Sequence, residues 1–407
     1  MRVLVVAGYI PFPPVGGGNT RVYHLLRALA GRHELSLVAF SWGEPGVPPP
    51  FPVRVIDVPW EMSPLYQQMM YGGDAHSAAA LHALTYETEE PFFASFYQSA
   101  AMEERLQGIG RGSDLILIEG SYMARYLDVL PADVPKVVDL LDLHTLMARR
   151  EFESATAEER AGALGEAERT LRYERRVASR CAACLAVSED EAAAARVLLQ
   201  VKNVWVVPNG VDTRFFSPSE EPPEAGYLLF TGMMDYAPNV DAACYFSQEI
   251  LPLIRRELPQ ATLHIVGVNP DPAVQELASE SVVVHGAVPD MRPFFRAAEV
   301  VVVPLRRGGG TRLKILEAAA SGRAIVTTSL GAEGLGFRDR TELLIADSAP
   351  AFAQAVVNLI QEEARRQQLE RAARAAAGPY NWDSISSRFR GMIEALRPEK
   401  RHAVSAG

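Results

Sequence analysis

Three features that mark large classes of proteins are scarce in this chain: cysteine, long apolar runs and an excess of positive charge. Its 407 residues include only three cysteines, Cys181, Cys184 and Cys244. They are too few and too scattered for a disulfide framework, and the Cys-Ala-Ala-Cys spacing has no second pair nearby that would complete a zinc site. We interpret them as small buried apolar side chains.

Long apolar runs are missing as well. No segment reaches the about 18 uninterrupted apolar residues that a membrane-spanning helix needs. The opening residues MRVLVVAGYIPFPP hold an apolar run that is too short for a signal peptide or a membrane span. We therefore expect a cytoplasmic protein without a transmembrane segment, and leave open a peripheral contact with the inner face of the membrane.

The charge balance is negative. The formal net charge of −10 argues against nucleic acid as a partner. Acidic residues outnumber basic ones in residues 1–206 too, so a dense basic face for anionic lipid is not evident. No Asp-x-Asp element follows a predicted strand, and no His/Cys/carboxylate cluster has metal-ligand spacing, so we expect neither a metal nor a cofactor.

What the chain does contain is typical of a globular α/β protein. An apolar content of 48% with 22% charged residues is ordinary, and 407 residues exceed what one core usually holds. Short Val/Ile/Leu runs alternate with helical segments, which is typical of buried parallel strands in doubly wound sheets. The predicted strands are Val3–Ala7, Leu35–Phe40, Val53–Val58, Asp114–Ile118, Val137–Leu141, Cys184–Val187, Val204–Val207, Leu228–Thr231, Leu263–Val266, Val282–His285, Val300–Pro304, Ala324–Thr327 and Leu344–Ala346.

A Pro-bearing segment divides these strands into two sets. We predict two Rossmann-like domains, residues 1–207 and 224–380, with residues 208–223 as the linker. Ligands on such sheets bind outside the carboxyl ends of the strands, so we expect both domains to face a central cleft. A dinucleotide oxidoreductase is disfavoured, because Gly16, Gly17 and Gly18 come too long after the first strand for the G-x-G-x-x-G turn.

The most informative segment is RGGGTRLKILEAAASGRAIVTTSLGAEG, residues 307–334. A glycine-rich loop that leads into a helix presents backbone N–H groups and the positive end of the helix dipole, which together suit a diphosphate. Arg312 and Lys314 add positive charge in the first turn, and Glu317 is placed to accept hydrogen bonds from hydroxyls of the same ligand. The alternative is a glycine-rich connection without a ligand.

This segment resembles the donor site of the retaining GT-B glycosyltransferases of glycosyltransferase family 4 (glycosyl transferases group 1). The resemblance continues in VVPNGVDTRFFSP, LLFTGMMDYAPNVDA, LHIVGVNP, VVVHGAVPDMRPFFRAAEVVVVPL and YNWDSISSRFRGMI. It implies a hexosyl transferase of class EC 2.4 that moves a sugar, with retention and without a metal, from a UDP-, GDP- or similar nucleotide-diphosphate sugar. The implied acceptor is a hydroxyl of a glycan, glycolipid or polysaccharide precursor, and a lipid-linked acceptor stays open.

The resemblance also implies site residues. Donor binding would involve Gly232, Gly267, Gly308, Gly309, Gly310, Thr311, Arg312, Lys314 and Glu317. The loop with Gly16, Gly17 and Gly18 would reach toward the donor phosphate and the acceptor, unless it is a plain surface turn. Backbone groups near residues 286–288 would form the base pocket. The last helix, residues 381–400, would cross back to complete the first domain.

Asp142 and His144 in VVDLLDLH follow a predicted strand, where the resembling enzymes carry a His or Asp that faces the acceptor. A carboxylate there could orient the attacking hydroxyl or accept its proton. Asp142 fits this catalytic position best and His144 second. The alternative for Asp142 is the N-cap of the helix that begins near His144.

Two departures from the family pattern leave other functions open. The family's first Glu falls on Gly309, and the usual Arg and Lys after the first strand of the second domain are replaced by Met233, Met234 and Asp235. A catalytically silent nucleotide-sugar-binding protein of the same fold is therefore an alternative, and a sugar-nucleotide epimerase is a weaker one. The segment from residue 60 to 108, rich in Met, Tyr and Phe, suits an acceptor pocket, a partner surface or core helices equally well.

Overall fold

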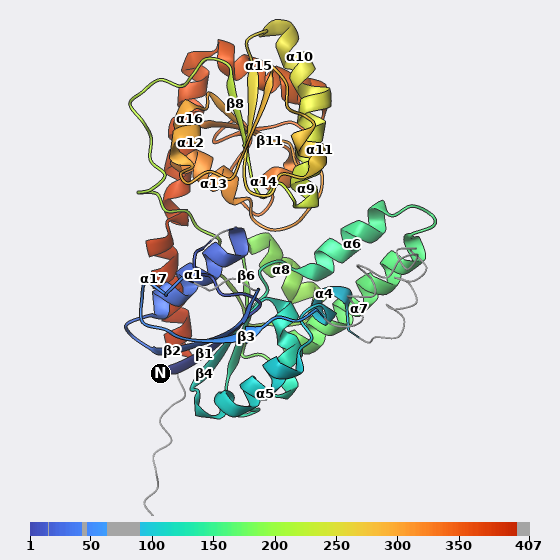
Figure 1. Ribbon diagram of the computed structural model, residues 1–407, viewed down its shortest axis with the longest axis vertical. Coiled ribbons are helices and arrows are strands. Elements are labelled where there is room, and N and C mark those ends of the chain that lie inside the picture. Colours follow the sequence, from blue (N-terminus) through green and yellow to red (C-terminus); the bar gives the residue numbers. More distant parts are fainter. Residues whose placement is uncertain (15, 43–46, 63–89, 397–407) are drawn as a thin grey trace, which may run out of the picture. The chain divides into compact units, whose positions relative to one another are not determined.

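The computed structural model describes residues 1–14, 16–42, 47–62 and 90–396 (Figure 1). The chain forms two compact units: Met1–Val207 together with the chain from Ser386, and Pro208–Ile385. Part of the predicted acceptor insertion, residues 63–89, lies outside the described residues. No helix in the described ranges is both long and apolar enough to cross a membrane.

The first unit is built on a parallel sheet of seven strands in the order β3-β2-β1-β4-β5-β6-β7. The order reverses between β1 and β4, and the carboxyl ends of strands at such a point are where doubly wound sheets bind ligands. Consecutive apolar residues make these strands because both faces of the sheet are covered: five of the six residues of β1 and all of β4 are buried. The strands are β1 (Arg2–Ala7), β2 (Glu34–Ser41), β3 (Arg54–Pro59), β4 (Leu115–Glu119), β5 (Lys136–Asp139), β6 (Ala183–Ala186) and β7 (Val204–Val206).

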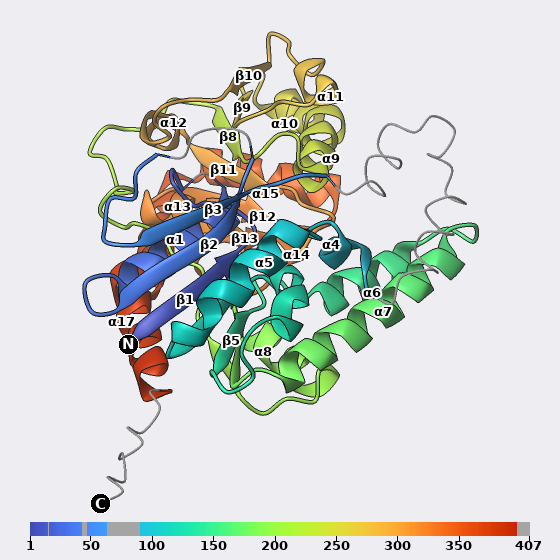
Figure 2. The same cartoon turned by 60° about the horizontal axis from the view of Figure 1, so that its bottom comes forward.

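Helices cover both faces of this sheet (Figures 1 and 2). Among them the C-terminal helix α17 lies beside α1, where Arg390 donates to the carbonyl of Ala28 at 3.3 Å and Glu394 lies 3.5 Å from His33. The helical segments are α1 (Gly17–Leu29), α4 (Phe92–Ser95), α5 (Ala100–Ile109), η3 (Ser121–Asp128), α6 (His144–Ser154), α7 (Arg160–Ser179), α8 (Glu189–Leu198) and α17 (Trp382–Ala395).

The second unit has a parallel sheet of six strands in the order β10-β9-β8-β11-β12-β13, with its reversal between β8 and β11. The strands are β8 (Tyr227–Thr231), β9 (Thr262–Val266), β10 (Val282–Gly286), β11 (Val300–Val303), β12 (Ala324–Thr327) and β13 (Leu344–Ile345). Its helices are α9 (Ala237–Tyr245), α10 (Leu251–Glu257), α11 (Pro272–Gln275), α12 (Arg292–Ala297), α13 (Leu313–Ala320), α14 (Ser329–Ala332), α15 (Ala349–Gln361) and α16 (Glu363–Ala377).

Each of the thirteen predicted strand segments coincides with a strand of the structure to within one or two residues at its ends. The predicted fold class, two doubly wound parallel sheets, is thereby confirmed. The three cysteines carry free thiols, and Cys184 is buried in β6.

Candidate functional site

The glycine-rich loop of the second unit leads from β11 to α13. Gly308 has φ 101° and Gly310 has φ 74°, a left-handed backbone that glycine adopts without strain. The helix begins at Leu313, so Arg312 is the N-cap residue and does not lie in the first turn as predicted. Its guanidinium donates to the carbonyl of Gly310 at 2.6 Å and thus braces the loop.

Glycines also let the neighbouring strand ends pack closely. A Cβ on Gly267 would lie 1.6 Å from the carbonyl oxygen of Gly232, and one on Gly232 would lie 3.0 Å from Nζ of Lys314. A Cβ on Gly308 would lie 3.1 Å from the ring of Pro238, in the segment that follows β8. The predicted glycines after β8, β9 and β11 therefore line one small region, with Lys314 in it.

Lys314 is the best-defined side chain of this region. Its ammonium group donates to Oδ1 of Asn239 at 2.7 Å and lies 4.3 Å from the centre of the Phe230 ring. Burial lowers the pKa of Lys314 to about 7, with a further contribution from Arg312, while Glu317 acts in the opposite direction. Asn239 was not predicted as a site residue, although it belongs to the Asp-Tyr-Ala-Pro-Asn segment that carries the family resemblance.

Glu317 lies one helical turn after Lys314 and is partly buried. Burial raises the pKa of Glu317 to about 7, against the influence of Lys314. The hydroxyl oxygen of Thr311 is buried and has no hydrogen-bond partner in the described residues. The region thus combines left-handed glycines, an ammonium, a hydroxyl and a carboxyl, the groups that a phosphate with an attached sugar or ribose requires.

Two further cations approach the start of the loop. Arg306 and Arg307 pair with Asp241 of α9 at 2.9 and 3.0 Å. Burial acts to raise the pKa of Asp241, but hydrogen bonds from the two arginines outweigh it and lower this pKa. These pairs fasten the glycine loop to α9, the helix that also supplies Asn239.

In the first unit, Asp142 and His144 follow β5. Leu141 has φ 60°, and Asp142 is partly exposed just before α6. The alternative that Asp142 caps this helix is wrong, because Leu143 is the N-cap residue. A carboxylate from another helix serves the start of α6 instead. Glu174 of α7 accepts from the backbone N–H of Thr145 at 2.9 Å and from its hydroxyl Oγ1 at 2.7 Å. Asp142 is therefore not needed for capping.

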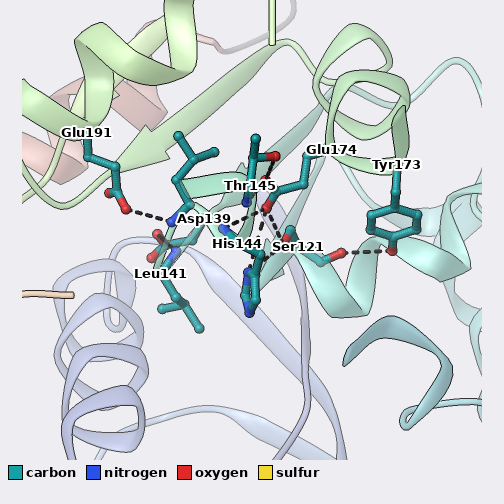
Figure 3. A network of polar contacts seen from close by, with 9 residues as sticks. Ser121, Asp139, Leu141, His144, Thr145, Tyr173, Glu174 and Glu191 are labelled. Carbon is teal, nitrogen blue, oxygen red and sulfur yellow. Dashed lines mark hydrogen bonds and ion pairs between the residues drawn. The ribbon is translucent and has the colours of Figure 1, made fainter. Parts of the chain in front are cut away.

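His144 is held from two sides. Its Nδ1 lies 3.2 Å from Oγ of Ser121 and 3.6 Å from Oε1 of Glu174 (Figure 3). Its ring stacks on Phe93 at 4.0 Å. Burial acts to lower the pKa of His144, but the hydrogen bond and charge of Glu174 outweigh it and raise this pKa. A raised pKa favours the imidazolium form, which suits electrostatic stabilisation better than proton abstraction.

A buried group of charges lies at the ends of β4 and β5. Arg21 of α1 donates to both oxygens of Asp139, at 2.6 and 3.1 Å, and to the carbonyl of Val207 at 2.7 Å. Glu119 is in register with Asp139 on the neighbouring strand and is buried with it. Burial, followed by the charge of Asp139, raises the pKa of Glu119 well above its usual range.

The glycines Gly16, Gly17 and Gly18 stand at the start of α1, with Gly16 as the N-cap residue at φ 81°. Thr20 donates to the Gly16 carbonyl at 2.8 Å. A Cβ on Gly18 would lie 2.2 Å from the hydroxyl of Tyr9, so this turn packs against the residues after β1. The sequence did not single out three charged residues of this region: Arg21, Glu119 and Glu174. Two of them carried a signal, because Arg21 comes shortly after a glycine loop and Glu119 is the last residue of a strand.

Residues 225–362, which include the glycine loop of residues 308–310, match the family model described as glycosyl transferases group 1. The phosphatidyl-myo-inositol mannosyltransferase of Mycolicibacterium smegmatis is 26% identical over 202 residues, 47% of this chain and 51% of that protein. The D-inositol 3-phosphate glycosyltransferase of Acidothermus cellulolyticus is 26% identical over 226 residues, 50% of each chain. An uncharacterized 44.6 kDa protein in the cps region of Klebsiella pneumoniae is 24% identical over 140 residues, 32% of this chain and 36% of that protein. The chain thus spans between about a third and about half of the length of these relatives.

Solved structures resemble nearly the whole chain. HepE from Anabaena, in complex with UDP and glucose, has a TM-score of 0.69 at 14% identity and covers 96% of this chain and 99% of its own. Sucrose-phosphate synthase from Thermosynechococcus elongatus has a TM-score of 0.69 at 16% identity and covers 97% of this chain and 99% of its own. At these identities the likeness shows the fold alone. The two units have the GT-B fold, and the second is related to the group 1 glycosyltransferases.

Proposed function

We propose that this protein is a glycosyltransferase that moves a sugar from a nucleotide-diphosphate sugar to a hydroxyl acceptor. The observation that carries the proposal is the arrangement of Lys314 and Glu317 one turn apart on α13, directly after the glycine loop. The family match over residues 225–362 covers this loop and helix. The names of the related mannosyl- and glycosyltransferases and the UDP and glucose of HepE support the same reaction class.

In this proposal the diphosphate lies on the backbone N–H groups of residues 308–311. Arg312 and Lys314 neutralise its charge, and Glu317 accepts hydrogen bonds from the ribose. The helix dipole and these cations stabilise the leaving diphosphate without a metal ion. In the described residues no group of three or more His, Cys, Asp or Glu side chains is arranged to hold a metal ion.

Transfer with retention is the stereochemistry that the family resemblance implies. The bond between the anomeric carbon and the diphosphate breaks, a bond to the acceptor oxygen forms on the same face, and the leaving diphosphate takes the acceptor proton. Asp142 positions the acceptor hydroxyl, and His144 contributes positive charge beside it. The acceptor belongs to a glycan, glycolipid or polysaccharide precursor.

A silent nucleotide-sugar-binding protein is the second candidate, because Gly309 stands where the family has its first Glu. A sugar-nucleotide epimerase is the weaker one. Incubation of the protein with UDP-glucose and GDP-mannose separates the three. Release of UDP or GDP with free sugar supports the transferase, an epimerised donor supports the epimerase, and intact donors support the silent protein.

The donor site is tested by a thermal-shift screen against UDP, GDP, ADP and dTDP, followed by calorimetry with the nucleotide that stabilises most. A charge-assisted hydrogen bond contributes roughly 1.5–3 kcal/mol, so Glu317→Ala should weaken this binding by about ten- to a hundredfold. Glu363→Ala, on the exposed first turn of α16, is the matched control. Unchanged affinity of the Glu317 variant would exclude the proposed placement of the ribose.

A further inference from the structure

Three aromatic rings form a platform beside the sheet edge of the first unit. Trp42 follows β2, Trp60 follows β3, and Phe96 follows α4. The Trp42 ring lies 4.3 Å from Trp60 and 5.8 Å from Phe96, with interplanar angles of 21° and 19°. Trp60 and Phe96 are also in contact, at 5.0 Å. We call these three residues the aromatic platform.

Trp42 is exposed but fixed. Its side chain is 46% exposed, and its Nε1 donates to the carbonyl of Gly8, directly after β1, at 3.1 Å. A single exposed apolar residue is ordinary, but this indole is held by a hydrogen bond and by contacts with the rings of Trp60, Phe96 and Tyr97. The fixed indole thus presents a rigid aromatic surface to a ligand at little further entropic cost.

The platform continues as a track of ring contacts toward His144. Phe96 contacts Tyr97 at 5.1 Å, Tyr97 stacks on Tyr122 at 4.4 Å, and Tyr122 contacts His144 at 6.3 Å. The hydroxyl of Tyr122 donates to that of Tyr9 at 3.4 Å. The aromatic platform is therefore continuous with the region to which the proposed function assigns the acceptor.

Glycines bring this track over the strand ends. A Cβ on Gly8, after β1, would lie 2.9 Å from both Tyr97 and Tyr122. A Cβ on Gly120, after β4, would lie 2.4 Å from Tyr122, and Gly120 has φ 88°. The rings thus cover the carboxyl ends of β1 and β4, between which the strand order reverses. Ligands of doubly wound sheets bind at this point.

The chemistry of the track matches a carbohydrate. A pyranose has a face of C–H groups that packs on a flat aromatic ring and a rim of hydroxyls that form hydrogen bonds. The indole of Trp42 offers such a ring, and the tyrosines further along the track carry hydroxyls.

We propose that the exposed face of Trp42 binds a pyranose ring of the acceptor, whose reacting hydroxyl lies further along the track toward Asp142 and His144. The acceptor is then a glycan or a glycolipid with at least one sugar already attached. This inference rests on the proposed transferase function and adds the substrate class of its acceptor side.

The test titrates the protein with methyl α-glucopyranoside, methyl α-galactopyranoside and methyl α-mannopyranoside, and follows binding by calorimetry, which does not depend on the Trp42 indole as a reporter. We expect saturable binding of at least one of them, and an affinity about tenfold or more weaker in Trp42→Ala. Trp42→Phe, which keeps an aromatic ring, should retain most of the binding. Trp205→Phe, in β7, is the control for loss of a tryptophan elsewhere.

Calorimetry with UDP on the same variants separates this proposal from the proposed function. Unchanged UDP binding together with weaker glycoside binding in Trp42→Ala supports the platform. Glycoside binding that is absent from the wild type, or equal in Trp42→Ala, overturns it while leaving the donor site intact. A Trp42-dependent binding to vesicles of phosphatidylcholine and phosphatidylglycerol, without glycoside binding, would assign the platform to a membrane surface instead. Absence of binding of UDP, GDP, ADP and dTDP alike to the wild type would count against the transferase itself.

Discussion

The carboxyl ends of the two sheets carry opposite chemistry on the same type of fold. In the first unit, charges are neutralised within the protein: Arg21 pairs with Asp139, and His144 lies beside Glu174. In the second unit, the ammonium of Lys314 bonds to the neutral amide of Asn239 and lies beside a glycine loop.

This difference indicates what each edge can bind. An edge whose charges are already paired gains little from an anion, but its hydroxyls and aromatic rings suit a neutral polyol. An edge with a desolvated ammonium and left-handed glycines gains most from a phosphate. The same strand–helix architecture thus carries two different chemistries through a few side chains at its strand ends, which is the basis for proposing an acceptor side and a donor side.

The largest expected effect comes from breaking the buried ion pair of the first unit. Arg21→Met leaves the carboxylate of Asp139 buried without its partner, and such changes cost about 3–5 kcal/mol of unfolding free energy. Urea unfolding followed by far-UV circular dichroism measures this loss. The double variant Arg21→Met/Asp139→Leu should recover much of it.

Glu119→Gln is the matched comparison in the same buried group. The pKa of Glu119 is raised by burial and by Asp139, so its neutral form is favoured and an amide should replace it at a cost of about 1 kcal/mol or less. A carboxyl with a raised pKa stabilises the fold below its unfolded pKa, and this contribution is lost as the pH rises through the folded value. The variant should therefore lose less stability than the wild type at alkaline pH. An equally large loss of unfolding free energy in the Arg21 and Glu119 variants would contradict this distinction between the carboxylate of Asp139, which needs its arginine partner, and the carboxyl of Glu119, which an amide can replace.

The next effect concerns turnover on the acceptor side. Asp142→Asn removes the carboxylate that we propose positions the acceptor hydroxyl, and we expect kcat to fall by about a hundredfold. Nucleotide affinity should stay within about twofold, the pattern of a group that acts in the transition state. Steady-state kinetics together with calorimetry give both quantities. A variant with normal kcat would remove Asp142 from the mechanism.

An effect of similar size is expected on the proposed donor side, but in nucleotide affinity rather than in turnover. Lys314→Met removes a charge-assisted contact, so UDP should bind about ten- to a hundredfold more weakly. Lys202→Met, at an exposed lysine of the first unit, is the control and should change nothing. If both variants bind UDP normally, the phosphate does not lie at Lys314.

The smallest effect is a pH dependence of nucleotide binding. The pKa of Lys314 is about 7 in the free protein, and a bound phosphate favours its charged form, so affinity should fall as the pH rises above about 7. The pKa of Glu317 is also about 7, and only its ionised form accepts hydrogen bonds with both oxygens, so affinity should fall below about 7 as well.

Calorimetry between pH 5.5 and 8.5, corrected for the ionisation of the nucleotide, should therefore give a maximum near pH 7, with at most about a tenfold change per pH unit. Lys314→Met should remove the alkaline decline and Glu317→Gln the acidic one. A flat profile in the wild type would show that neither group changes its protonation on binding.

The sequence by itself determined the strands, the fold class and the glycine loop of residues 308–310. Buried parallel strands need consecutive apolar residues, a local property that is visible in segments such as Val300–Val303. The glycine loop was visible for the same reason, because residues 308–317 follow one another in the chain and Lys314 and Glu317 lie one helical turn apart on α13. The position of Arg312 was off by one residue, as helix boundaries often are.

Only the tertiary structure decided which distant residues complete the two edges. Arg21 and Asp139 are 118 residues apart, and the carboxylate that caps α6 comes from Glu174, 29 residues after Thr145. The aromatic platform joins residues that follow β2, β3 and α4. No local period or spacing encodes such pairs, because the sheet order β3-β2-β1-β4-β5 places side chains beside each other by strand pairing rather than by position in the chain.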